Sequence, residues 1–198
     1  RQLRAVQRLC RHQDRDGHRP ADNVSVKTFG TRYGIDDGLL LASTEGKRGG
    51  PTLRSATYAY AAADAGPFPS RVGYINAPAD SMGRIHRPPS QRVILQQAVR
   101  FESTATAFDV FARQRAAVQS SSLGYSRPES VAYYDHTSLW VLGQAASRTI
   151  AGVETFSASF KPDTALPLAS TRFGKPQASY EFAGDGTLSK VIDPLNHA

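Results

Sequence analysis

The sequence predicts an all-β protein built as an array of antiparallel β-hairpins. Segments rich in Val, Thr, Phe and Tyr alternate polar and apolar residues with period two, as strands do. Gly- and Pro-containing stretches separate these segments where hairpins need turns. The 198-residue chain is 40% apolar and 21% charged, which is too apolar for a disordered chain. We therefore expect it to fold.

The last hairpin provides a template for the others. Residues 180–182 (Tyr-Glu-Phe) alternate across a strand, Gly184 and Gly186 suit a tight turn, and Leu188–Ile192 returns as a second strand. Asp193-Pro194 then ends the ladder, because proline has no amide hydrogen and restricts the residue before it. The expected unit is strand, turn, strand, turn.

Aromatic residues recur at predicted strand ends along the chain. Upstream of Phe182 they are Tyr33, Tyr60, Phe108, Tyr134 and Phe160. The last three intervals are 26, 26 and 22 residues, and the interval before them, 48 residues, is about two steps. A recurrence of this length is typical of repeat arrays. With nine Phe and eight Tyr in the chain, an accidental ladder is the alternative.

Strands and turns can be placed between these anchors. We expect strands in "VRFESTATAFDVF" (99–111), "VETFSASF" (153–160) and "QASYEF" (177–182), and turns in "SSSLGYSRP", "KPDTALP" and "FGKP". Residues 58–198 are predicted to form hairpin repeats with a Pro-rich insertion near 76–90. Residues 1–57 are predicted to form divergent N-terminal β repeats.

These residues resemble the YD-repeat, or RHS-repeat, family, which is named after a Tyr-Asp pair in a pattern like Y-D-x-x-G-R-L-x-x-V-x-D-P-x-G. The C-terminal copy has Ala183 in place of the Asp and Asn196 in place of the last Gly, and a second copy has Ala112 in place of the middle Gly. The motif residues that match, or that flank the match, are Phe108, Asp109, Arg113, Tyr134, Asp135, Tyr180, Phe182, Gly186, Leu188, Val191, Asp193 and Pro194. We expect all of them to have structural roles.

The resemblance implies a strip of hairpins that curls as part of a larger β-shell in a bacterial protein. In bacterial toxins of this kind the shell encloses a toxic C-terminal segment, and in animal teneurins it belongs to an adhesion receptor. The implied role is therefore structural and non-catalytic, without a cofactor, in a secreted or cell-surface protein. The implied partners are neighbouring repeats of the same chain and an enclosed C-terminal effector segment.

A different class of function stays open, namely a cell-surface binding module for glycan or protein partners. Aromatic side chains on a β surface can stack on sugars. The candidates are Tyr58, Tyr60, Tyr133, Tyr134 and Trp140. Packing of these side chains between parts of the shell is the alternative, because aromatic residues in strands usually pack.

Composition excludes several other classes. The net charge is +7, but Arg is spread along the chain and clusters only before Pro20, so we expect no nucleic-acid partner. The longest aliphatic run, at Gly38 to Ala42, is far shorter than the roughly 20 residues of a membrane-spanning helix. A single cysteine, Cys10, excludes an intrachain disulfide and a multi-cysteine zinc site.

Near-matches to catalytic and metal-binding motifs are weak. "GYSRP" has Pro128 where a nucleophile elbow around Ser126 needs Gly, so we interpret it as a turn. "HQDRDGH" (12–18) lacks the distal Glu of a calcium loop and is interpreted as a polar turn. Three acids in Gly- and Ala-rich loops and three glycines spaced by four are interpreted as loop residues: Asp36, Asp37, Asp64, Gly30, Gly34 and Gly38. We expect no enzyme in this segment.

Overall fold

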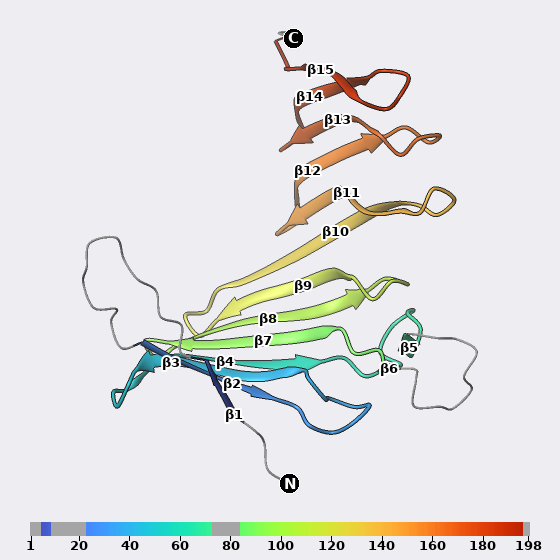
Figure 1. Ribbon diagram of the computed structural model, residues 1–198. Helices are drawn as coiled ribbons and strands as arrows, with labels where there is room; N and C mark the ends of the chain where they lie inside the picture. Colours follow the sequence, from blue (N-terminus) through green and yellow to red (C-terminus); the bar gives the residue numbers. More distant parts are fainter. Residues whose placement is uncertain (1–4, 9–22, 73–83, 196–198) are drawn as a thin grey trace, which may run out of the picture. The chain divides into compact units, whose positions relative to one another are not determined.

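The computed structural model describes residues 5–8, 23–72 and 84–195, all of which form strands, turns or loops (Figure 1). Cys10, the 12–18 segment and residues 73–83, which include the first half of the Pro-rich insertion, lie outside this part of the chain. The all-β prediction is confirmed, since the described residues contain strands and no helix.

Thirteen strands of the described residues follow one another in a single open sheet, in the order β1-β2-β3-β4-β7-β8-β9-β10-β11-β12-β13-β14-β15. β5 and β6 form a separate two-stranded sheet. The bounds are β1 Ala5–Arg8, β2 Asn23–Phe29, β3 Leu40–Lys47, β4 Thr52–Tyr60, β5 Arg71–Val72, β6 Arg84–Ile85, β7 Pro89–Gln96, β8 Val99–Phe108, β9 Gln114–Ser121, β10 Ser126–His136, β11 Val141–Ile150, β12 Val153–Phe160, β13 Pro167–Arg172, β14 Lys175–Phe182 and β15 Leu188–Ile192. The predicted strands at 153–160 and 188–192 match β12 and β15.

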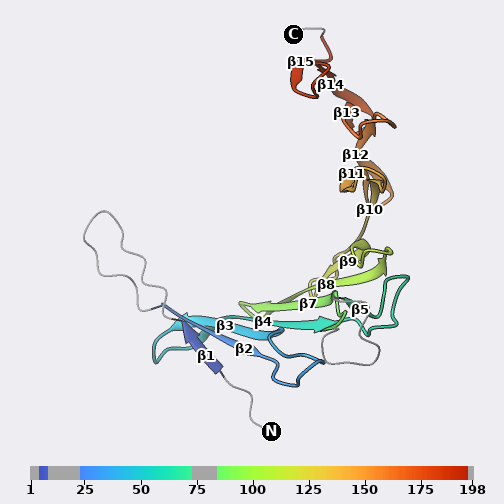
Figure 2. The ribbon, with the colours of Figure 1, turned by 45° about the vertical axis from the view of Figure 1, so that its right-hand side comes forward.

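The chain divides into two compact units. Unit 1 comprises Arg1–Gln114 and Val118–Ser126, and unit 2 comprises Arg115–Ala117 and Arg127–Ala198. In unit 2 the strands β10 to β15 form a meander, which Figure 2 shows as a single layer. The two units are defined by how compactly the chain packs. The predicted boundary at residue 57 is defined instead by similarity between repeats, and it stays a prediction.

Three hairpins close with two-residue turns. The turns are Gln97-Ala98 between β7 and β8, Ala151-Gly152 between β11 and β12, and Phe173-Gly174 between β13 and β14. All six residues have positive φ, between 49° and 81°. Positive φ at both central residues defines the type I′ turn, whose twist matches that of paired strands. The turn at "FGKP" was predicted from the sequence. The turn at Gln97-Ala98 was not predicted, because it contains no Gly.

Longer turns follow the even-numbered strands, and aromatic residues lie at or near these strand ends. Phe29, Tyr60 and Phe108 end β2, β4 and β8 in unit 1, while Phe160 and Phe182 end β12 and β14 in unit 2. The prediction of Tyr33 as an anchor is wrong. Tyr33 lies in the turn after β2 and is 75% exposed, because Phe29 already occupies the strand end.

Little of the described sheet is buried. The buried apolar residues are Ala56, Ala61, Phe68, Ala117 and Ala165, and no large side chain among the described residues is fully buried. Phe68 belongs to the segment between β4 and β5, and its ring packs edge-on against Phe108 and His86 at centroid distances of 5.7 and 5.3 Å. The segment between β4 and β5 therefore provides unit 1 with the one large buried aromatic side chain of the described residues, and His86 of the insertion packs against it. In Figure 1 the small β5–β6 sheet lies by the end of β4.

Candidate functional site

The turn after β8 is organised by the carboxylate of Asp109. Its Oδ1 accepts hydrogen bonds from the backbone amides of Phe111 and Arg113, both at 2.9 Å. Its Oδ2 accepts from Nε of Arg113 at 2.8 Å and forms an ion pair with Nη2 at 2.7 Å. The Asp109 side chain is 10% exposed and the Arg113 side chain 22% exposed. Charge-assisted bonds from a guanidinium fork to a carboxylate are among the stronger side-chain bonds, so this pair fixes the turn.

The backbone of the same turn requires a left-handed residue. The Asp109 amide donates to the Arg113 carbonyl and the Ala112 amide donates to the Asp109 carbonyl, each at 3.0 Å. Ala112 has a φ of 59°, a conformation that suits Gly better than Ala. Ala112 occupies the place where the repeat pattern has Gly.

The turn after β14 repeats this backbone pattern with different side chains. The Ala183 amide donates to the Thr187 carbonyl, and the Gly186 amide donates to the Ala183 carbonyl, each at 2.9 Å. Gly186 has a φ of 85° and takes the place of Ala112. Asp185 replaces Asp109 as the capping acid, because its Oδ1 accepts from the amide and the hydroxyl of Thr187. The Thr187 hydroxyl and amide lower the pKa of Asp185.

The turn between β10 and β11 differs from the other two. Asp135 reaches across the hairpin and accepts a hydrogen bond from the Gly143 amide at 2.8 Å. Trp140, with a φ of 56°, closes the turn and is 71% exposed. His136 Nε2 contacts the Pro162 carbonyl at 2.8 Å, which connects this turn to the next one in unit 2.

Several of the aromatic anchors contact neighbouring hairpins. The Tyr134 ring stacks on the Phe160 ring with a centroid distance of 4.8 Å, and the Tyr134 hydroxyl donates to the Lys161 carbonyl at 3.3 Å. The Tyr60 hydroxyl donates to the Leu40 carbonyl at 2.9 Å, and burial raises the pKa of Tyr60. Tyr134 and Tyr60 therefore connect strands within a unit, which limits their use as a glycan platform.

The remaining motif residues lie on the last hairpin of unit 2. Tyr180 pairs with Val191, and its hydroxyl lies 3.4 Å from that of Ser170. Phe182 pairs with Leu188 beside an irregularity in the register. Leu188 and Val191 are 54% and 45% exposed. Asp193 caps the start of the next turn by accepting from the Leu195 amide at 2.9 Å, next to Pro194.

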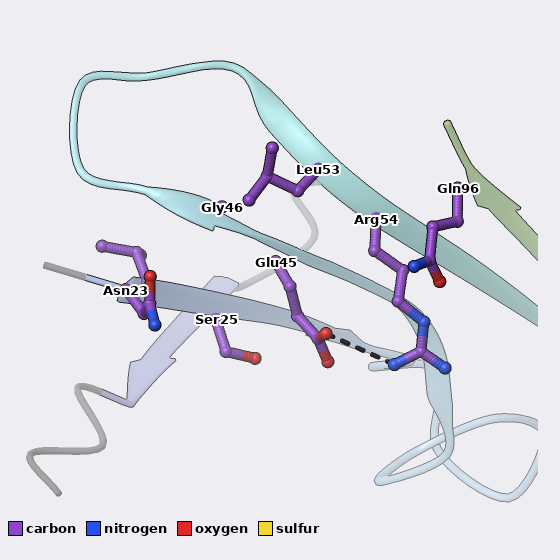
Figure 3. Close-up of a pocket in the computed structure, with 8 residues that line it drawn as sticks. Asn23, Ser25, Glu45, Gly46, Leu53, Arg54 and Gln96 are labelled. Carbon is purple, nitrogen blue, oxygen red and sulfur yellow. Dashed lines mark hydrogen bonds and ion pairs between the residues drawn. The ribbon is translucent and has the colours of Figure 1, made fainter. Parts of the chain in front are cut away.

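A polar hollow of about 390 Å³ lies on unit 1, where β2, β3, β4 and β7 are neighbours in the sheet (Figure 3). Its centre is one cross-strand row, since Ser25 pairs with Glu45, Glu45 with Arg54, and Arg54 with Gln96. Glu45 Oε2 and Arg54 Nη1 lie 3.3 Å apart and form an ion pair. Together the hollow is lined by Asn23, Val24, Ser25, Glu45, Gly46, Leu53, Arg54 and Gln96. Sequence reasoning missed it, because the row appears only once the register is known.

A smaller cavity of about 230 Å³ lies between the β2–β3 loop and residues 85–87. Asp37, His86 and Arg87 line it, and Nδ1 of His86 is buried without a hydrogen-bond partner in the structure as described. The Arg87 guanidinium donates to the carbonyls of Ala61 and Ile35, so it holds the insertion against the loop. These bonds give Arg87 a packing role.

The other acids and the serine singled out in the sequence lie in separate parts of unit 1. Asp36 is 6% exposed and accepts from the amide and Nε of Arg32 at 2.8 and 2.7 Å. The Arg32 side chain, through this hydrogen bond, lowers the pKa of Asp36. Asp64 is exposed, and Ser126 begins β10. No group of three or more potential metal ligands is found within the described ranges.

Neither a family model nor a curated protein matches this chain. The resemblance to YD repeats therefore rests on the motif residues and on the turns that they form. In the described part of the chain no helix is long and apolar enough to cross a membrane.

Proposed function

We propose that this chain is a non-catalytic structural segment of a YD-repeat shell that encloses or displays an effector segment, in a secreted or cell-surface protein. The observation that carries the proposal is the turn after β8. Its Asp-x-x-x-Arg ion pair and left-handed fourth residue occupy the positions where the repeat pattern has Asp, Gly and Arg. The turn after β14 has the same backbone bonds.

The open sheet supports the same role. Four of the five buried apolar residues among those described are alanines, so the strands bury little apolar surface against one another's faces. A strip of this kind gains stability mainly from ladder hydrogen bonds and from contacts with adjacent hairpins, as repeat arrays do. Covering its faces with further repeats or an enclosed segment would supply the missing apolar burial.

The experiment is limited proteolysis of the full-length gene product. We expect a C-terminal segment to resist digestion in the intact protein and to be digested when it is produced alone. Asp109→Ala with Arg113→Ala should speed its digestion, because the pair fixes a turn of the strip. Asp163→Ala, at an exposed position in the turn after β12, is the matched control and should change nothing. A C-terminal segment that is digested equally fast with and without the rest of the chain would contradict the proposal.

A further inference from the structure

We propose that Ser138, in the turn between β10 and β11, is an acyl-acceptor site that takes the acyl group of an activated ester, with His136 as its base. This inference goes beyond the structural role proposed above and does not depend on it, because a single acylation leaves the group on the chain and requires no turnover. The near-match to a nucleophile elbow in the sequence concerns a different serine, Ser126.

Hydrogen bonds fix the tautomer of the His136 ring. The Leu139 amide donates to Nδ1 at 3.2 Å, so Nδ1 has a lone pair and carries no proton. The proton of the neutral ring is therefore on Nε2, which lies 2.8 Å from the Pro162 carbonyl oxygen and donates to it. Nδ1 is left as the basic atom of the ring, and the Pro162 carbonyl holds the ring in place.

The hydroxyl of Ser138 lies within hydrogen-bonding distance of this basic atom. Its Oγ is 3.2 Å from Nδ1, and because Nδ1 carries no proton, the hydroxyl is the donor. A nucleophile within roughly 2.6 to 3.2 Å of a base, with the base oriented by a third group, is the arrangement that activates serine for acyl transfer. Ser138, His136 and the Pro162 carbonyl have these three roles.

The reaction moves one proton and exchanges one acyl bond. Oγ of Ser138 attacks the ester carbonyl carbon while Nδ1 of His136 takes the hydroxyl proton. The tetrahedral intermediate then collapses, the bond to the leaving alcohol breaks, and the imidazolium gives the proton to the departing oxygen. The products are an acyl ester on Ser138, a free alcohol and a neutral histidine, so atoms and charge balance.

The Leu139 amide becomes available to the intermediate during this step. It belongs to the residue after the nucleophile, which supplies one oxyanion-hole donor in hydrolases with a nucleophile elbow. In the resting turn this amide donates to Nδ1 of His136. Once Nδ1 takes the proton of Ser138 it can no longer accept this bond, so the amide is released as negative charge develops on the substrate oxygen.

The surroundings of Ser138 favour a small activated ester. Leu139 is 50% and Trp140 71% exposed, so two apolar side chains directly follow the nucleophile at the surface. The whole turn 137–140 is exposed and does not exclude water. The orienting group is a carbonyl rather than the carboxylate that stabilises the imidazolium of a triad. Both features lower the rate, so the acyl donor needs a good leaving group, as an aryl ester has.

The test is acetylation of the 198-residue chain by p-nitrophenyl acetate, after its β-sheet circular dichroism has been verified. Peptide mass spectrometry gives the acetylation rate of each serine. Ser122 is the internal reference, because it is also an exposed turn serine and its Oγ accepts from the Arg100 amide at 3.1 Å. General-base catalysis contributes roughly 10²- to 10⁴-fold in enzymes, and at this exposed turn we expect Ser138 to react about tenfold or more faster than Ser122.

The matched variant is His136→Asn, whose side-chain oxygen can still accept from the Leu139 amide but cannot take up a proton. It should lower the acetylation rate of Ser138 about tenfold or more and leave that of Ser122 within about twofold. In urea, where the contact with the base is lost, Ser138 and Ser122 of the unaltered chain should react equally fast. Equal rates in the folded chain, an unchanged Ser138 rate in His136→Asn, or a preference for Ser138 that persists in urea would each overturn the proposal.

Discussion

A single non-glycine residue with positive φ lowers the stability of the hairpin that contains it by a measurable amount. Ala112 has a φ of 59° in the turn fixed by Asp109 and Arg113, and a left-handed conformation costs a non-glycine residue about 1 to 2 kcal/mol. We expect Ala112→Gly to raise the free energy of unfolding by about 1 kcal/mol, because the relief of strain exceeds the added entropy of the unfolded chain. Urea unfolding measures this directly.

The control for this substitution is Ala105→Gly, in the middle of β8. There glycine loses more conformational freedom and no strain is relieved, so the free energy of unfolding should fall by about 0.5 to 1 kcal/mol. If both substitutions destabilise the chain equally, the left-handed conformation of Ala112 does not limit its stability.

Two carboxylates with lowered pKa values should make the free energy of unfolding decrease at low pH. The pKa of Asp36 is lowered by hydrogen bonding to Arg32, and that of Asp185 by Thr187. A carboxyl group whose pKa is lower in the folded state than in the unfolded state stabilises the fold at pH values above the unfolded pKa, which is about 3.9. This stabilisation is lost as the pH falls through the folded-state pKa. The urea midpoint should therefore be level above about pH 5 and fall below about pH 4.

Replacing one of these two acids measures how much it contributes to the pH dependence of stability. Asp185→Asn keeps an acceptor for the Thr187 amide and hydroxyl but cannot titrate. Its urea midpoint should fall less steeply below pH 4 than that of the unaltered chain. Asp64→Asn, at an exposed loop position, serves as control. An unchanged slope in Asp185→Asn would show that this turn does not contribute to acid sensitivity.

Pairs of side chains connect the hairpins as elements. Tyr134 and Phe160 stack at 4.8 Å with an angle of 13° between their rings, and they end or nearly end β10 and β12. Stacked aromatic pairs are worth about 0.5 to 1.5 kcal/mol beyond the area they bury. A double-mutant cycle with Tyr134→Ala and Phe160→Ala should give a coupling energy of this size.

Phe173 provides the comparison for that cycle. It lies in the turn between β13 and β14 and is 67% exposed. Tyr134→Ala and Phe173→Ala should therefore add without coupling. Additivity in the Tyr134–Phe160 cycle would contradict the stacking interaction.

Strands bounded by glycine and proline were predictable from the sequence, whereas features that depend on register were not. β12 and β15 match their predicted bounds, because glycine or proline lies within two residues of each end of both strands. Gln97-Ala98 could not be recognised as a type I′ turn, since neither residue favours positive φ. Tyr33 was misassigned because spacing alone does not distinguish a strand end from the loop after it.

The candidate site shows the same limit. The residues of the polar hollow come from strands up to about seventy positions apart in the chain, and they meet only through three successive registers. Composition and spacing contain no signal for such a row. The Asp109–Arg113 turn is local, by contrast, so the sequence could point to its residues through the repeat pattern.

At the scale of the whole molecule, the linear strand order predicts stability that is distributed along the chain. The strand pairs in extensive contact are adjacent in the sheet order. In such an array, the free energy of unfolding is roughly a sum of contributions from the hairpins and from the interfaces between them. Removing the last hairpin should therefore destabilise mainly the hairpin next to it.

We expect a chain that ends before β14, at residue 174, to keep the rest of its sheet. Hydrogen exchange should show β13 losing protection while β2, β3 and β4 keep theirs, because the sheet neighbours of these three strands all belong to unit 1. Loss of protection throughout β2 to β8 in the shortened chain would instead show one cooperative domain, and the repeat-array interpretation would then be wrong.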